Sequence, residues 1–134
     1  MTDPTHPDAQ AIWSAVRDMY DAYLDGDRER SNSHIAPDVT LWDTAHEPLV
    51  STRDGLDALR DTRPEPDPAT RVVAIETGDP VIDVWGDIAL VRHTFEVVFA
   101  SEELPRERVR NTGVWHRRDG RWLVVHNHED VLPS

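Results

Sequence analysis

Hydrophobic and polar positions divide this 134-residue chain into a helical first part and a strand-rich second part. From Asp8, a suitable helix cap, to Gly26, a helix stop, apolar residues recur at helical spacing. They are Ile12, Val16, Met19 or Tyr20, and Tyr23 or Leu24. Residues 27–35 predict a second, short helix before Pro37, and Thr52 is a suitable N-cap for a third that includes Leu56 and Leu59.

The rest of the chain predicts strands. Apolar runs or alternating patterns cover residues 39–43, 71–75, 81–85, 88–100, 109–117 and 121–128. The last two runs flank Arg118-Asp119-Gly120, whose turn chemistry predicts a hairpin, while the prolines of residues 63–70 predict a loop. Helices first and strands later indicate one α+β domain over residues 1–134, with helices packed on one face of a curved antiparallel sheet.

Strand alternation assigns polar candidates to the two faces of this sheet. The row expected to face the helices is mostly apolar, and His93 is the polar exception within it. Asn111 lies on the same face as Trp115, and Asn127 on the same face as Glu129. His126 and His128 fall on the opposite, outer face, where we expect an interface or hydrogen bonds rather than a metal.

Composition excludes several function classes. The chain has no Cys, and all 14 of its basic residues are Arg, so thiolate zinc sites, cysteine nucleophiles and Schiff-base lysines are ruled out. A formal net charge of -12 argues against nucleic acids and anionic membranes as partners. No apolar run is long enough for a signal peptide or a membrane span, so a cytoplasmic protein is expected. Phosphate loops and dinucleotide fingerprints do not occur in the sequence, and no cofactor is expected.

Four segments together resemble the nuclear transport factor 2-like superfamily, also called SnoaL-like. They are a first helix closing on Leu-Asp-Gly-Asp, "IAPDVTLWD", a Gly-Asp turn into a long strand, and "VWHRRDGRW" followed by "VVHNH". The last motif is similar to the association domain of calmodulin-dependent kinase II. The resemblance implies a cone-shaped, cystatin-like roll around a pocket, usually as a homodimer through the outer face of the sheet. The superfamily contains both enzymes and binding proteins, so this fold does not determine the function.

The resemblance also implies roles for single positions. The general base of ketosteroid isomerases matches Asp43, whereas the positions of their oxyanion donors match Met19 and Gly113, which carry no side-chain donor. The pocket arginines of the hub domains match Phe95, Gly113 and Glu129, none of which is basic.

Three residues are therefore candidates for catalysis. Asp43 at the end of a strand facing an apolar cone would have a raised pKa, as a base working near neutrality needs. Glu129 would be a second acid/base group, and His93 or Tyr23 would polarise a substrate oxygen. The expected substrate-binding residues are Met19, Tyr23, Phe95, Asn111, Trp115 and Asn127. The alternative for each is a plain core or surface role.

The sequence thus predicts a pocket for a small, largely apolar organic molecule. The favoured function is a cofactor-free acid/base enzyme of the isomerase, dehydratase, epoxide hydrolase or polyketide cyclase type. The alternative is a non-catalytic ligand-binding or oligomerisation module. A weaker alternative, a metal-free carbonic anhydrase, comes from a further resemblance. Some carbonic anhydrases of this fold end in a His-rich motif followed by two Ser; "HNHED" is similar in two of the His but lacks the hydroxyl residues.

Overall fold

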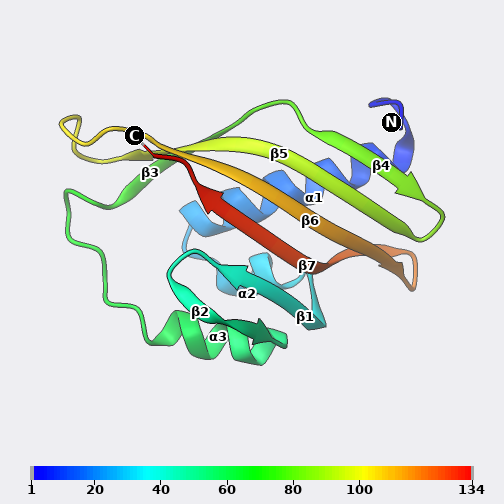
Figure 1. The fold of residues 1–134 in the computed structure, drawn as a ribbon, viewed down its shortest axis with the longest axis horizontal. Coiled ribbons are helices and arrows are strands. Elements are labelled where there is room, and N and C mark those ends of the chain that lie inside the picture. Colours follow the sequence, from blue (N-terminus) through cyan, green and yellow to red (C-terminus); the bar gives the residue numbers. More distant parts are fainter. Residues whose placement is uncertain (1, 134) are drawn as a thin grey trace.

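Three helices and seven strands form an α+β fold in a computed structural model, which describes residues 2–133. In chain order they are α1 (Pro7–Leu24), α2 (Arg28–Asn32), β1 (Ile35–Asp43), β2 (His46–Ser51), α3 (Arg53–Asp61), β3 (Val72–Thr77), β4 (Val81–Trp85), β5 (Ile88–Phe99), β6 (Glu107–Arg118) and β7 (Arg121–Val131). In Figure 1, α1 lies along the sheet of β5, β6 and β7, and α2 and α3 lie near β1 and β2. No helix within residues 2–133 is both long and apolar enough to cross a membrane.

All strands belong to one curved sheet in the order β2-β1-β7-β6-β5-β3, with β4 also paired to β5. The pairs are antiparallel except β1 with β7, which is parallel. The predicted α+β class, with helices on a curved, mostly antiparallel sheet, is confirmed, and the one parallel pair, β1 with β7, was not predicted. Strand β2 was also missed, because its short sequence HEPLVS contains Pro48 and reads as a loop.

Local signals explain most element boundaries. The helix α1 begins after His6, whose Nδ1 accepts from the Asp8 N–H, so the cap lies two residues before the predicted one. Asp27 and Thr52 cap α2 and α3 through their side-chain oxygens. Between β6 and β7, Asp119 and Gly120 both have positive φ, the backbone of a two-residue hairpin turn.

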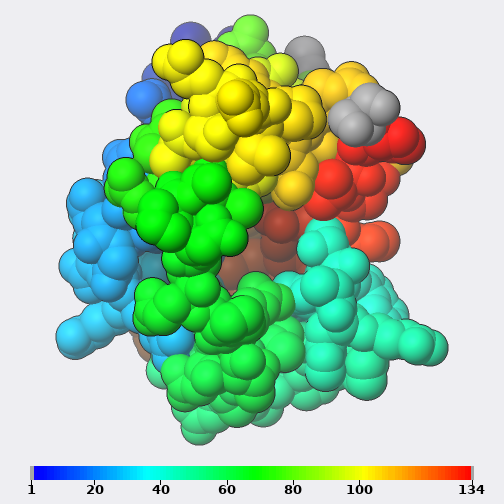
Figure 2. All heavy atoms as spheres, turned by 90° about the vertical axis from the view of Figure 1, so that its left-hand side faces the viewer, coloured from blue at the N-terminus to red at the C-terminus, as the bar shows by residue number. Residues whose placement is uncertain are grey.

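The core lies between α1 and the concave face of the sheet. Its largest fully buried side chains are Ile12, Val39 and Val91, from α1, β1 and β5. Along β5 the buried positions are Ala89, Val91, His93 and Phe95, as strand alternation predicts. This packing fills one part of the concave side of the sheet. Elsewhere, Figure 2 shows a hollow rimmed by the green segment after α3, the yellow segment between β5 and β6, the red C-terminal part and the green-cyan β1–β2 region.

Candidate functional site

The hollow leads into a cavity of about 460 Å³ between α1, α3 and the concave face of the sheet. All nine residues that the sequence assigns to catalysis or substrate binding line this cavity. Aliphatic and aromatic side chains make up most of its wall. A volume of this size suits a small organic molecule.

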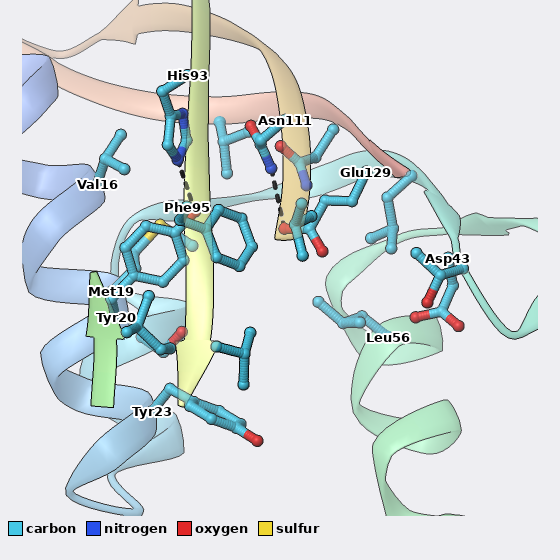
Figure 3. A pocket seen from close by; sticks show the side chains of 18 of the residues that line it. Val16, Met19, Tyr20, Tyr23, Asp43, Leu56, His93, Phe95, Asn111 and Glu129 are labelled. Atoms are coloured by element: carbon cyan, nitrogen blue, oxygen red, sulfur yellow. Dashed lines mark hydrogen bonds between the residues drawn. The ribbon is translucent and has the colours of Figure 1, made fainter. Parts of the chain in front are cut away.

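Three polar side chains form a row across the cavity. Asn111 on β6 is the register partner of both His93 on β5 and Glu129 on β7. Neighbouring strands lie about 4.8 Å apart, so this register spaces the three residues evenly over the concave face. Figure 3 shows the row running from His93 through Asn111 to Glu129, with Asp43 beyond it near α3.

Glu129 is partly buried and held by amides rather than by a cation. Asn111 Nδ2 donates to its Oε1 at 2.9 Å, and Asn127 also donates to the carboxylate. Burial raises the pKa of Glu129; the two amide hydrogen bonds oppose this, and the negative charge of Asp43 adds to it. The outcome is a raised pKa, so this carboxyl exchanges a proton more readily near neutrality than an ordinary glutamate.

His93 is neutral and bonded to Tyr20. His93 is 6% exposed, and burial lowers its pKa to about 4. Its Nε2 lies 2.7 Å from the Tyr20 hydroxyl, and Trp13 and Phe95 pack on its ring. Its Nδ1 is buried without a partner in the described part of the chain. We assign the proton to Nε2, because a bare lone pair at Nδ1 costs less than a buried N–H without an acceptor.

In this tautomer, His93 donates to the Tyr20 oxygen, which leaves the Tyr20 O–H free to donate into the cavity. Burial, together with the charge of Glu129, raises the pKa of Tyr20 well above its usual value, so Tyr20 keeps its proton. Tyr20 was not among the predicted site residues, because helical spacing alone did not separate it from Met19. Tyr23 lines the cavity one turn on, but is 60% exposed.

Asp43 has a cationic partner at the cavity mouth. Arg63 Nη2 donates to its Oδ1 at 2.6 Å, and the Ala45 N–H donates to its Oδ2 at 2.9 Å. Burial of the side chain, which is 14% exposed, raises the pKa of Asp43, but these two hydrogen bonds and the charge of Arg63 outweigh it and leave the pKa lowered. The expectation of a raised pKa at Asp43 is therefore wrong, because the loop after α3 brings Arg63 to this carboxylate, a contact that no local pattern indicates.

The remaining predicted polar residues lie away from the cavity. His126 Nδ1 lies 2.7 Å from Thr40 Oγ1, and His128 is exposed. Within residues 2–133, no three His, Asp or Glu side chains gather closely enough to hold a metal ion. His126 and His128 are also not among the residues that line the cavity.

The fold and this cavity can be compared with known proteins. The sequence profile of the SnoaL-like domain matches residues 12–132. The chain belongs to the SnoaL-like family.

Solved structures agree with the resemblance to the nuclear transport factor 2-like superfamily seen in the sequence. A calmodulin-dependent kinase II hub from S. rosetta is 22% identical with a TM-score of 0.77, over 97% of this chain and 100% of that one. A putative ketosteroid isomerase from Parabacteroides distasonis is 17% identical with a TM-score of 0.73, over 90% and 85%. A protein of unknown function with a cystatin-like fold from Nostoc punctiforme is 19% identical with a TM-score of 0.77, over 99% and 97%. At these low identities the TM-scores show a shared fold alone, and the activity has to be argued from the cavity.

Proposed function

We propose that this SnoaL-like protein is a cofactor-free acid/base enzyme acting on a small, largely apolar substrate that carries a carbonyl or related oxygen. The observation that supports this most strongly is Glu129, a carboxyl with a raised pKa that faces a mostly apolar cavity and has no cationic partner among residues 2–133. A base whose pKa approaches the working pH is efficient at proton transfer in both directions.

In an isomerisation, the Glu129 carboxylate removes a proton from the carbon next to the carbonyl. The electron pair of the broken C–H bond moves toward the carbonyl oxygen, where the Tyr20 O–H stabilises the growing negative charge. The protonated Glu129 then returns the proton to a different carbon. His93 is the positioning residue that fixes the Tyr20 hydroxyl. Dehydration, epoxide opening and cyclisation would use the same base and the same donor.

The proposal gives the role of base to Glu129 and not to Asp43. Asp43 is ion-paired with Arg63, and a lowered pKa makes its carboxylate a weaker base. Its role in the proposal is to hold the segment after α3 at the cavity mouth.

The test is a panel of small enones, hydroxy ketones and epoxides, assayed with the wild type, Glu129→Gln and Asp43→Asn. Loss of a positioned base costs about 10²- to 10⁴-fold in rate. We expect that loss in Glu129→Gln and a much smaller one in Asp43→Asn. Equal turnover by the wild type and Glu129→Gln would remove Glu129 from the mechanism. A loss confined to Asp43→Asn would return the role of base to Asp43.

We propose further that the protein self-associates as a homodimer through the outer face of the sheet. Leu90, Val114 and Leu123 lie on adjacent strands of this face and are only partly buried, and Trp42 is 42% exposed. Similarity in fold to domains named as kinase hubs makes a larger ring the competing assembly. Light scattering separates them: a dimer agrees with the proposal, a ring supports a hub-like module, and a monomer contradicts both.

A further inference from the structure

Two cavity-lining side chains beside Gly113, Trp115 and Asn127, each carry a polar atom that the proposed reaction does not use. Gly113 lies in the middle of β6, between its register partners Val91 and Asn127. It is not one of the glycines with positive φ, so the backbone does not require glycine here. A Cβ at this position would lie 3.2 Å from Trp115 Nε1 and 3.3 Å from Asn127 Oδ1, both tight contacts. Because Gly113 has no side chain, the indole edge of Trp115 and the amide oxygen of Asn127 can both lie close to its backbone.

Neither of these polar atoms has a hydrogen-bond partner within the described residues 2–133. Trp115 is only 3% exposed and lines the cavity, yet its Nε1–H donates to no acceptor within residues 2–133. An indole N–H that lines a cavity and has no protein acceptor is available to a ligand, because it can only donate. Asn127 directs its amide nitrogen to Glu129, which orients its Oδ1 as an acceptor toward Gly113. This part of the cavity thus offers one donor and one acceptor side by side, with no hydrogen bond joining them.

We propose that Trp115 and Asn127 form a subsite for a hydroxyl group of the ligand. A hydroxyl both accepts and donates, so one oxygen can accept from the Trp115 N–H and donate to Asn127 Oδ1. A ketone or ether oxygen satisfies only Trp115, and an apolar group satisfies neither. The inference rests on the proposed function in that the cavity holds the substrate, and it narrows the substrate class to alcohols, phenols or hydroxy ketones.

The test is a binding series with phenol, anisole and toluene, three probes of similar shape that differ in hydrogen bonding. Phenol donates and accepts, anisole only accepts, and toluene does neither. The chain has 5 Trp residues, so an NMR spectrum of the indole N–H groups is simple, and Trp115→Phe assigns the signal. We expect phenol to bind most tightly, toluene least, and phenol to shift the Trp115 indole signal.

Variants then locate the effect. A neutral hydrogen bond contributes about three- to tenfold in affinity, so Trp115→Phe and Asn127→Ala should each reduce the preference for phenol over toluene by that factor. Gly113→Ala should do the same by adding a Cβ against both groups, and it provides the test if Trp115→Phe fails to fold. The matched control is Trp85→Phe, because Trp85 is 60% exposed on β4, and this variant should bind all three probes as the wild type does.

The outcomes separate this inference from the proposed function. Equal binding of phenol and toluene, or phenol binding with an unmoved Trp115 signal, overturns the subsite and leaves the role of Glu129 intact. Failure of all three probes to bind overturns the cavity as a ligand site, and both proposals fall with it. Loss of turnover in Glu129→Gln tests the proton transfer alone.

Discussion

Two carboxyl groups line the same cavity and have opposite electrostatic surroundings. Glu129, over the sheet, is held by two neutral amides, and its pKa is raised. Asp43, at the mouth, is held by Arg63 and a backbone N–H, and its pKa is lowered. Burial favours the neutral form of both, so the difference comes from the partner. A carboxyl in an apolar cavity is a candidate base only when no cation is beside it.

His93 belongs to the same neutral half of the cavity as Glu129. Burial without a charged partner lowers the pKa of His93 just as it raises the pKa of Glu129, and in both cases the uncharged form is favoured. Burial thus shifts the pKa values of both interior groups toward the uncharged form, whereas the mouth carries an ion pair between Asp43 and Arg63. Three predictions test this division, from the largest expected effect to the smallest.

The first prediction concerns the stability of the fold at low pH. The unfolded His93 takes up a proton near pH 6.5, but the folded one only near pH 4, so stability falls as the pH drops through this window. Between pH 7 and pH 4 this linkage amounts to about 3 kcal/mol. We expect urea unfolding at pH 7 and pH 4 to show that His93→Gln loses about 3 kcal/mol less stability than the wild type over this range.

The difference between the wild type and His93→Gln removes the pH-dependent contributions of all other titrating groups, because both proteins contain them. Glu129 acts with the opposite sign, since a raised folded pKa makes stability fall as the pH rises through its window. Asp18, with a pKa of about 2, loses its contribution mainly below pH 4. His128→Gln is the control, because His128 is exposed. An identical loss of stability in the wild type and His93→Gln would mean that His93 is accessible to protons in the folded state.

The second prediction compares the partners of the two carboxyls. Asn111→Ala leaves Glu129 with one amide donor in the interior and should cost about 1–3 kcal/mol of unfolding free energy at pH 7. Arg63→Gln removes a partner that is 48% exposed, and an exposed ion pair is worth only about 0–1 kcal/mol. Denaturant unfolding of both variants measures this directly. A larger cost for Arg63→Gln would mean that the mouth, and not the interior, is the rigid part of the site.

The fold was predictable where the determining signal is local. The helix α1 and the strands β5, β6 and β7 follow from apolar periodicity and turn residues, and the same alternation places His93, Asn111 and Glu129 on one face. Features that depend on distant contacts were not predictable. The parallel pair β1–β7 joins residues about 90 positions apart, such as Ile35 and Val124.

The site followed the same rule. Strand alternation indicates which side chains face the cavity, but not what lies opposite them. Arg63 sits in a proline-rich segment whose path over the cavity mouth is set by tertiary packing, so its pairing with Asp43 and the lowered pKa of that carboxyl could not be inferred. The contact of Tyr20 with His93 also joins two elements 73 residues apart, and helical spacing could not choose between Met19 and Tyr20.

The third and smallest effect concerns salt. The lowered pKa of Asp43 depends in part on the charge of the half-exposed Arg63, and counterions screen such a pair. Glu129 owes its raised pKa first to burial, on which salt acts little. In carboxyl NMR titrations, the pKa of Asp43 should therefore be a few tenths of a unit higher at high ionic strength than at low ionic strength. The pKa of Glu129 should stay nearly fixed. Asp43→Asn and Glu129→Gln assign the two signals. Equal sensitivity to salt would mean that both carboxyls face water alike, and Glu129 would then lose the low-dielectric environment on which its role as a base depends.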